Sequence, residues 1–529
     1  MTAIASAWKE LTLAQLLGEL AECRASLRGD PQLRVSSITE DSRKVRPGSL
    51  FVARQGQRVD GTRFIEAAFQ AGACCVLCEP QVSVKGRPVI YVDQLNRAWG
   101  LAAQALAAHP SRDLKVIGIT GTNGKTTVAS LVAEALAHDG QLSARLGTLG
   151  FFIGAELIAP SLTTPQPDQL AESLVLARQR GARYALMEVS SHALDQQRVA
   201  GISFEAAALT NISQDHLDYH GTMQAYQSAK ERLFFEHRPR SVVLNVGDRA
   251  GRSLADRLQG QDGFVFTVCT TEKHFASLFA RQVRVSRDGI SARLHHRSRA
   301  ADGGDRETPG ICLTSRLLGR HNLENLLVAG GLLMALGHDL TNVCDLLSRC
   351  VGVPGRMERC DGAGDDVTVV VDYAHTEDAL LRALSTLAEL KFSPIICVFG
   401  CGGDRDRGKR PHMGQVAAAH ADQVFVTSDN PRSERPEQII EDVLAGTLES
   451  GTPVVCDPDR RQAILSSVLD APPGAAILVA GKGHEDYQLV GDQVLPFDDR
   501  HEARAALASR RERRRVTSGR AVPGPSGES

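Results

Sequence analysis

The segment that most constrains this chain is a strand-like run that leads directly into a glycine-rich loop and a helix. Residues 115–119 are mostly apolar, Thr120-Gly-Thr-Asn-Gly-Lys-Thr-Thr127 follows, and an amphipathic run then continues to Gly140. This order is typical of a nucleotide-phosphate cradle, because loop N–H groups and the helix N-terminus face the anion. The standard spacing would place a glycine at Ile119, so ATPase, kinase and ligase all stay open.

The loop and a nearby acidic residue supply the groups that an ATP phosphate chain requires. Lys125 can reach the β- and γ-phosphates, and the hydroxyl of Thr126 can bind Mg²⁺ at the start of the helix. A second strand-like run ends at Glu188, where ligands of parallel sheets collect, and Mg²⁺ favours such oxygen donors. The predicted phosphate-binding residues are Gly121, Thr122, Asn123, Gly124, Lys125, Thr126 and Thr127.

Strands and helices alternate over most of the remaining chain, which predicts an α/β fold. Strand-like runs such as Ile395–Phe399 and Ala476–Ala480 are separated by helical stretches such as 379–390, the pattern of a mostly parallel sheet. A chain of 529 residues is too long for one core. We expect three domains, at 1–110, 111–350 and 351–508, the last of them Rossmann-like, and a disordered Arg-rich tail at 509–529.

Composition excludes several function classes. The 60 Lys and Arg residues nearly balance the 62 Asp and Glu residues, so no net field draws the protein to nucleic acid or an anionic membrane. No apolar stretch reaches the ~20 residues of a membrane span, and charges interrupt the N-terminus before a signal-peptide core forms. We expect a cytoplasmic protein that acts on small molecules, with its 12 cysteines as free thiols; the oligomeric state stays open, with a monomer favoured.

Further polar strings follow the phosphate loop in a fixed order along the chain. They lie at 188–192, 211–221, 229–234, 319–325, 355–358, 372–375 and 481–485. In order and spacing they resemble the Mur ligases, the ATP-dependent amide-forming enzymes of peptidoglycan precursor synthesis. Within that family, the strings at 402–411 and 429–432 are similar to those of members that add meso-diaminopimelate to UDP-N-acetylmuramoyl-L-alanyl-D-glutamate.

The resemblance assigns an expected role to residues in each predicted domain. It implies a domain for the UDP substrate, a central ATPase, and a C-terminal domain for the amino acid. The implied residues for the UDP-muramoyl peptide are Glu40, Ser42, Gln57, Arg58, Val59, Thr163, Thr164, Ser190, Gln196 and Arg198. Those for diaminopimelate are Arg405, Asp429, Asn430, Pro431, Arg432, Gly481 and Glu485, and those that frame ATP beyond the loop are Asn322, Asn325, Arg356, Asp372 and His375.

The chemistry that the resemblance implies is activation of a carboxylate followed by amide formation. The γ-carboxylate of D-glutamate attacks ATP to give an acyl phosphate, and the amine of diaminopimelate then displaces phosphate. The implied catalytic residues are Lys125, Glu188, Asn211, His216 and Lys230. Two Mg²⁺ ions are expected, one on Thr126 and Glu188 and one near His216, with Lys230 carbamylated to give a further oxygen ligand.

Three positions depart from the family pattern, and other functions stay possible. His321 stands where Phe is common, Glu377 where Pro is common, and Leu162 where a substrate-contacting Asn is frequent. A folylpolyglutamate-type ligase would share the phosphate loop and the lysine, and a P-loop switch ATPase would hydrolyse ATP without an amino-acid acceptor. A dehydrogenase is a weaker alternative, because the glycine string at 400–403 lacks the third glycine and the acidic partner of a dinucleotide site.

Overall fold

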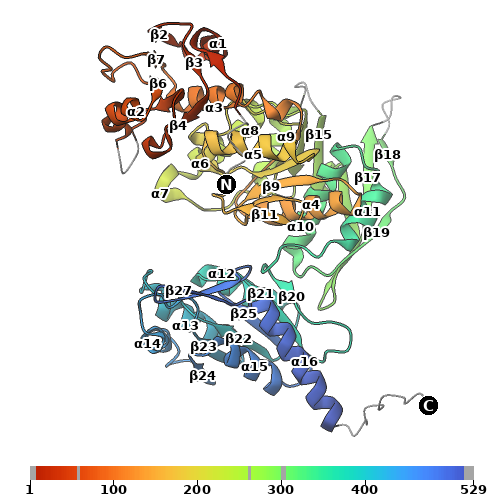
Figure 1. Ribbon diagram of the computed structural model, residues 1–529. Helices are drawn as coiled ribbons and strands as arrows, with labels where there is room; N and C mark the ends of the chain where they lie inside the picture. The colour runs from red at the N-terminus through yellow and green to blue at the C-terminus, as the bar shows by residue number, and fades with distance from the viewer. Residues whose placement is uncertain (1–7, 56–59, 260–263, 300–304, 518–529) are drawn as a thin grey trace, which may run out of the picture. The chain divides into compact units, whose positions relative to one another are not determined.

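The structure is a computed structural model, and it describes residues 8–55, 60–259, 264–299 and 305–517 (Figure 1). The sheets of the chain are mostly parallel. This confirms the predicted α/β class. The chain forms two units, each with its own core, and we describe each by itself. The first contains Met1–Arg281, Arg293–Cys312 and Glu324–Cys350, and the second contains Gln282–Ala292, Leu313–Leu323 and Val351–Ser529.

The N-terminal part of the first unit is a five-stranded sheet in the order β2-β7-β6-β5-β4, parallel except between β2 and β7. Its strands β5 and β6 are almost entirely apolar, as expected for strands covered on both faces. The elements are β1 (Leu11–Thr12), α1 (Leu13–Glu19), β2 (Ser26–Arg28), β3 (Arg34–Val35), β4 (Ser37–Thr39), β5 (Ser49–Val52), α2 (Ile65–Gln70), β6 (Ala73–Cys78), β7 (Val89–Tyr91) and α3 (Leu95–Leu106).

The inner strands of a twelve-stranded sheet, β9-β12-β8-β13-β14-β15, are parallel and belong to the first unit. The strands are β8 (Lys115–Thr120), β9 (Ser143–Gly147), β10 (Gly150–Ile153), β11 (Glu156–Ala159), β12 (Tyr184–Glu188), β13 (Ala206–Leu209), β14 (Ser241–Asn245), β15 (Phe264–Cys269), β16 (Leu278–Ser286), β17 (Gly289–Arg299), β18 (Asp305–Glu307) and β19 (Ile311–Ser315). The helices are α4 (Lys125–His138), α5 (Pro167–Gln179), α6 (Ser191–Asp195), α7 (Leu217–His220), α8 (Met223–Phe235), α9 (Arg249–Leu258), α10 (Arg320–Ala335) and α11 (Leu340–Arg349).

Strand register brings the predicted catalytic strings to one edge of this sheet. Glu188 pairs with Ile119, and Leu209 pairs with Thr120, so β8, β12 and β13 end side by side. The phosphate loop, Glu188 and the segment after Leu209 therefore start from neighbouring strand ends. This is the edge at which parallel sheets bind ligands.

The core beneath the N-terminal sheet is shared with the central sheet. Trp99 and Leu106 of α3 pack in one apolar cluster with Ala171 and Val175 of α5. This shared cluster explains why the N-terminal and central regions form one unit. The predicted division between 1–110 and 111–350 therefore stays a prediction.

The second unit contains a six-stranded sheet in the order β20-β21-β25-β22-β23-β24, parallel except for β20. Helices α12, α13 and α14 cover one face, and α15 and α16 cover the other, which is a Rossmann-like arrangement (Figure 1). The strands are β20 (Glu358–Arg359), β21 (Thr368–Asp372), β22 (Ile395–Phe399), β23 (Gln423–Thr427), β24 (Val454–Asp457) and β25 (Ala476–Ala480), with a separate hairpin of β26 (Tyr487–Val490) and β27 (Gln493–Pro496). The helices are α12 (Glu377–Glu389), α13 (Lys409–His420), α14 (Pro436–Leu444), α15 (Arg460–Asp470) and α16 (Asp499–Thr517).

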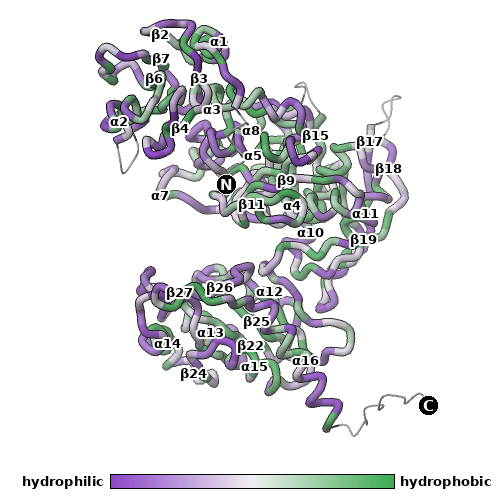
Figure 2. The backbone as a smooth tube through the Cα atoms, viewed as in Figure 1, coloured by the Kyte–Doolittle hydropathy of each residue, from purple (hydrophilic) through white to green (hydrophobic). Residues whose placement is uncertain are grey.

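The expectation of a disordered tail from residue 509 is wrong as far as Thr517. Residues 509–517 continue α16, although their hydrophilic character is plain in Figure 2. Arg510 is almost completely buried, where its guanidinium binds the Asp366 carboxylate at 2.8 and 3.0 Å and donates to the Val468 carbonyl at 2.6 Å. Arg511 pairs with Asp365 at 2.7 Å. Ion pairs hold this segment where apolar contacts are few, and residues 518–529 lie outside the described part.

A search of the described residues finds no helix that is both long and apolar enough to cross a membrane.

Candidate active site

Two glycines give the phosphate loop its shape. Gly121 has φ +144° and Gly124 has φ +85°, backbone conformations that other residues rarely adopt. A Cβ at Gly121 would lie 1.9 Å from Thr210 Oγ1, and one at Gly124 would lie 2.3 Å from Asn325 Oδ1. Neighbouring residues therefore leave no room for a side chain at either glycine. Asn325, a predicted ATP-binding residue, lies directly against the loop.

The loop is braced by the segment that follows β13. The N–H of Thr122 donates to the Asn211 carbonyl at 2.8 Å, and the N–H of Asn123 donates to Asn211 Oδ1 at 3.0 Å. Lys125 Nζ donates to the carbonyls of Gly121 and Thr122, both at 2.9 Å, and Thr127 follows in the first turn of α4. The structure thus brings Lys125 and Asn211 together, as predicted, with Asn211 shaping the loop.

The Glu188 carboxylate is the best-supported oxygen donor for a metal ion. It is 1% exposed at the end of β12, and it accepts from Thr126 Oγ1 at 2.9 Å, from the Thr148 N–H at 3.1 Å and from Thr148 Oγ1 at 3.1 Å. Among the described residues no three His, Cys, Asp or Glu side chains form a metal-binding group. The hydroxyl and carboxylate fit Mg²⁺ nevertheless, because this ion is commonly held by one or two protein oxygens together with water and substrate phosphates.

Lys230 of α8 lies beneath the phosphate loop. Its side chain is 2% exposed, its Nζ donates to the Gly121 carbonyl at 2.8 Å, and it lies 4.5 Å from the centre of the Tyr226 ring. Burial lowers the pKa of Lys230 to about 6, and the nearby Lys125 ammonium adds to this effect. An isolated sequence pattern would place such a lysine in solvent, whereas the fold places it under the phosphate site.

His216 lies in a group of aromatic rings beside this lysine. Its ring centre is 4.8 Å from that of His192 and 6.3 Å from that of Tyr226, and about half of its side chain is exposed. His216 has φ +52°, and its Nε2 lies 3.5 Å from Asp215. The predicted residues His216 and Lys230 thus approach Tyr226 from different elements.

The residues predicted to hold the muramoyl peptide form one chain of hydrogen bonds next to Glu188. Thr164 Oγ1 donates to the Glu188 carbonyl at 2.8 Å and accepts from the Ser190 N–H at 3.1 Å. Arg198 donates to the Thr164 carbonyl at 2.9 Å and to Gln196 Oε1 at 2.8 Å. Thr163 joins the same region, because its hydroxyl lies 3.2 Å from that of Thr148.

The residues predicted to lie near the UDP end are described only in part. Arg54 binds Glu40 at 2.7 Å, and Ser42 opens a short 3₁₀ helix at Ser42–Lys44. Gln57, Arg58 and Val59 lie outside the described residues.

The remaining predicted ATP-binding residues belong to the second unit: Asp372 and His375 lie at and after the carboxyl end of β21, Arg356 precedes β20, and Asn322 lies in α10. Asp372 ends β21, is 9% exposed, and accepts from the Met357 N–H at 2.7 Å; burial raises its pKa. The Arg356 guanidinium lies 4.9 Å from the Tyr373 ring centre, and His375 Nδ1 lies 2.8 Å from the Tyr373 carbonyl. Asn322 is buried at the start of α10, where its amide donates to the Leu318 carbonyl at 2.8 Å.

Residues from two loops in the second unit form a polar cluster that includes opposite charges: Asp429 and Asn430 follow β23, and Lys482 and Glu485 follow β25. Asn430 Oδ1 accepts from Lys482 Nζ and from the Leu489 N–H, both at 2.9 Å, so its amide nitrogen points to Glu485 Oε2, also at 2.9 Å. Lys482 is fully buried and lies 3.4 Å from Asp429, with burial lowering its pKa. Gly481 is required here, because a Cβ would lie 2.8 Å from Asp429 Oδ2 and its φ is +121°.

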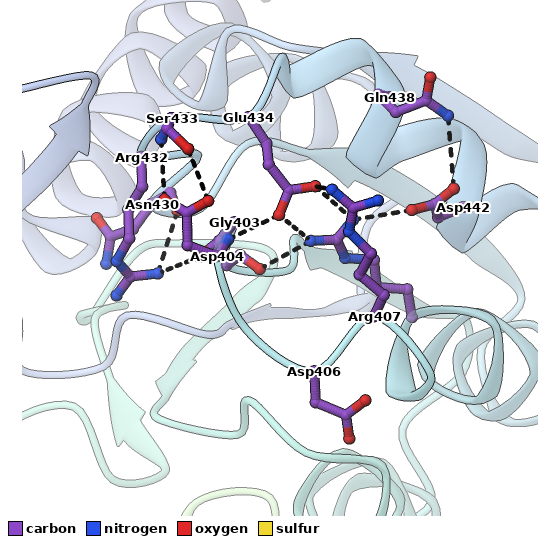
Figure 3. A network of polar contacts seen from close by, with 12 residues as sticks. Gly403, Asp404, Asp406, Arg407, Asn430, Arg432, Ser433, Glu434, Gln438 and Asp442 are labelled. Carbon is purple, nitrogen blue, oxygen red and sulfur yellow. Dashed lines mark hydrogen bonds and ion pairs between the residues drawn. The ribbon is translucent and has the colours of Figure 1, made fainter.

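Arg432 lies beside this cluster in a strained backbone conformation. Its φ is +51°, its N–H donates to the Leu489 carbonyl at 3.0 Å, and its Nη1 donates to the Gly403 carbonyl at 2.8 Å (Figure 3). Pro431 precedes it and is buried, whereas Arg405 is exposed on the facing loop. A Cβ at Gly402 would lie 3.0 Å from Arg432 Nη1 and 3.7 Å from Arg405 Cγ, so both arginines pass close to one point.

Comparison with known proteins identifies the family. The Mur ligase family catalytic domain matches residues 34–110, the Mur ligase middle domain matches 119–333, and the Mur ligase glutamate ligase domain matches 355–483. The UDP-N-acetylmuramoyl-L-alanyl-D-glutamate--2,6-diaminopimelate ligase of Thermosynechococcus vestitus is 42% identical over 483 residues, which cover 90% of this chain and 94% of that protein. The chain belongs to the Mur ligase family.

Other relatives extend this finding. The ligase of the same name from Pseudomonas putida is 42% identical over 93% of this Mur ligase and 98% of its own length. A solved structure of a ligase of that name is 36% identical, with a TM-score of 0.68 over 91% of this chain and 96% of that one. The folylpolyglutamate synthase of Mycobacterium tuberculosis, 19% identical with a TM-score of 0.53 over 81% of this chain, shares the fold alone. This Mur ligase is an ATP-dependent enzyme that forms an amide bond.

The three departures from the Mur ligase pattern lie on the surface. His321 is exposed in the first turn of α10, and Leu162 is 56% exposed near Thr163. Glu377 is exposed at the first position of α12, where an acidic side chain favours the helix dipole.

Sequence reasoning missed three side chains of this Mur ligase site, of which Tyr226 and Lys482 are buried and Thr148 is exposed. They are Thr148, which binds Glu188 twice; Tyr226, whose hydroxyl lies 3.0 Å from Thr122 Oγ1; and Lys482, which orients Asn430. Lys482 lies within the string at 481–485 and Tyr226 lies between the strings at 211–221 and 229–234, so the sequence marked these regions but not the roles of the two residues.

Proposed function

We propose that this enzyme adds meso-diaminopimelate to UDP-N-acetylmuramoyl-L-alanyl-D-glutamate. The names of the relatives that cover most of this chain support this assignment. The observation that carries it is the polar cluster of Asn430 and Glu485 beside Arg432. Diaminopimelate has a carboxylate and an ammonium at its distal end, and this cluster offers an amide and a guanidinium for the first and a carboxylate for the second.

The ATP phosphates, in this proposal, bind to the loop at Gly121–Thr127. Lys125 lies at hydrogen-bond distance from the loop carbonyls, so a small rotation of its side chain brings its ammonium to the phosphate oxygens. Thr126 and Glu188 would hold Mg²⁺, which when bound supplies positive charge that offsets the triphosphate. The adenosine contacts are assigned to Asn322, Asn325, Arg356, Asp372 and His375.

Activation of the substrate carboxylate requires two anions to approach each other, and the chain's own charges reduce that repulsion. The chain of Thr164, Ser190 and Arg198 is proposed to fix the muramoyl peptide next to Glu188. Its γ-carboxylate then attacks the γ-phosphate with ADP as the leaving group, giving an acyl phosphate. The free amine of the amino acid attacks the acyl carbon, the amide forms, and phosphate leaves.

Lys230 is proposed to be carbamylated and to act with His216 near a second Mg²⁺. Its depth under the phosphate loop supports this role, because a buried amine is predominantly neutral and a neutral amine attacks CO₂. A buried, uncharged lysine beside Lys125 would contribute little to stability, which favours a chemical role for Lys230. A second Mg²⁺, like the first, is part of the proposal.

The deciding experiment measures phosphate release with UDP-muramoyl dipeptide, ATP and a panel of amino acids. We expect turnover that requires both substrates, with meso-diaminopimelate strongly preferred over L-lysine. Efficient turnover with lysine and little with diaminopimelate would overturn the assignment. Turnover without any amino acid would favour a P-loop ATPase, and turnover with a folate substrate would favour a folylpolyglutamate ligase; a monomeric state and a cytoplasmic location stay predictions.

A further inference from the structure

Two loops that carry the proposed amino-acid-binding residues are joined by hydrogen bonds among Asp404, Ser433 and Glu434. The loop after β22 contains Asp404, and the loop after β23 contains Ser433 and Glu434 (Figure 3). Glu434 Oε1 accepts from the Asp404 N–H at 2.7 Å. The Asp404 carboxylate accepts in return from Ser433 Oγ at 2.7 Å and from the Ser433 N–H at 3.1 Å.

A buried arginine, Arg410, binds the Glu434 carboxylate that links the two loops. Arg410 of α13 has no exposed side-chain surface, and it binds Glu434 Oε1 at 2.8 Å and Glu434 Oε2 at 3.1 Å. Arg407 also contacts Oε2, at 2.9 Å. The hydrogen bond from Arg410 contributes most to lowering the pKa of Glu434 to about 2, so this carboxylate stays ionised at all working pH values.

The hydrogen bonds between the two loops hold backbone segments in conformations that they would otherwise leave. Asp404 has φ +53° and Arg432 has φ +51°, and residues with side chains keep such values only where their surroundings hold them. Gly403 lies between the two segments, since its N–H donates to the Asn430 carbonyl at 2.9 Å and its carbonyl accepts from Arg432. Freeing the Asp404 N–H would therefore loosen the segment that carries Asn430 and Arg432.

We propose that Glu434, fixed by Arg410, is a positioning residue that holds the Arg405 and Arg432 loops in the conformation that receives the acceptor amino acid. This proposal rests on the proposed function only in naming that amino acid as diaminopimelate. Glu434 acts through Asp404 and Ser433, and its lone pairs are directed at protein donors.

One neighbouring carboxylate provides a matched control. Asp442 of α14 binds Arg410 Nη1 at 2.8 Å, as Glu434 does, but its described bonds do not reach either loop. Asp442→Asn therefore perturbs Arg410 and the stability of the unit without freeing the Asp404 N–H. Glu434→Gln keeps the shape of the side chain but turns an NH₂ group toward a donor.

The test compares kcat and KM for all three substrates in the full-length wild type, Glu434→Gln and Asp442→Asn. If Glu434→Gln leaves one tenth of the loops correctly placed, KM for the amino acid rises about tenfold. We expect that rise with less than a threefold fall in kcat, unchanged KM for ATP and for the UDP substrate, and no KM change in Asp442→Asn. An unchanged amino-acid KM in Glu434→Gln, or equal rises in both variants, would overturn the proposal.

Two further experiments cover the cases of an unstable variant and of a different acceptor amino acid. If Glu434→Gln unfolds at the assay temperature, Ser433→Ala removes one bond to Asp404, and we expect a threefold rise confined to the amino-acid KM; a rise shared by all substrates would refute positioning. If the wild type uses an amino acid other than diaminopimelate, the proposed function fails. The same KM comparison is then made with that amino acid, so the two failures are separate.

Discussion

Replacing Arg432 by Ala should remove most of the enzyme's preference for meso-diaminopimelate over L-lysine. Both amino acids share the reacting end and a distal ammonium, and only diaminopimelate has a distal carboxylate for the guanidinium. An arginine left unpaired and buried would cost about 2–5 kcal/mol. Arg432, however, is half-buried and keeps the Gly403 carbonyl at 2.8 Å when lysine is bound, which favours the lower part of that range.

A value of about 2–3 kcal/mol corresponds to roughly 30- to 150-fold discrimination, at 1.4 kcal/mol per factor of ten. The assay is kcat/KM for each amino acid, measured with the wild type and with Arg432→Ala. Arg435→Ala is the matched control, because Arg435 is 84% exposed three residues away and pairs only weakly with Glu437, at 3.7 Å. A ratio of the two kcat/KM values that is the same in Arg432→Ala and in wild type would remove Arg432 from the specificity site.

Three further changes test other parts of the site and fold. Lys125→Ala should lower kcat about 10²- to 10³-fold at saturating ATP with an unchanged circular dichroism spectrum, and near wild-type turnover would contradict the phosphate-loop assignment. Lys230→Ala should be inactive but partly restored by acetate, whereas an active Lys230→Arg would contradict the carbamate. Asp499→Asn breaks a completely buried pair with Arg460 and should destabilise the second unit by about 3–5 kcal/mol. That loss lowers its Tm by roughly 6–20 °C in calorimetry, and an unchanged Tm would show that the pair is dispensable.

The sequence predicted elements best where one local pattern sufficed. The strands Ile395–Phe399 and Ala476–Ala480 have the predicted bounds, because each is a short apolar run between turn signals. The glycines of the phosphate loop were equally clear, since their spacing reflects a backbone requirement within one loop.

Pairs that are distant in sequence were not predictable in the same way. Arg410 and Glu434 are separated in sequence, and only the approach of two loops makes each the other's partner. The segment from Arg510 was read as a solvated tail for the same reason, because its partner Asp366 precedes it by 144 positions. A charged side chain is buried only when its counterion comes with it, and a single sequence does not show that pairing.

The ion pairs of α16 have a practical consequence for truncation and tagging of this protein. Arg510 and Arg511 pair with Asp366 and Asp365, just ahead of β21, the strand that ends at the predicted ATP-binding residue Asp372. Truncation after residue 508 would remove both ion pairs. Proteolysis near the C-terminus would therefore disturb the segment at Asp365 and Asp366, which is distant in sequence. High salt should weaken the half-exposed Arg511 contact well before the buried Arg510 contact, and an affinity tag is therefore better placed beyond Thr517 than within the helix.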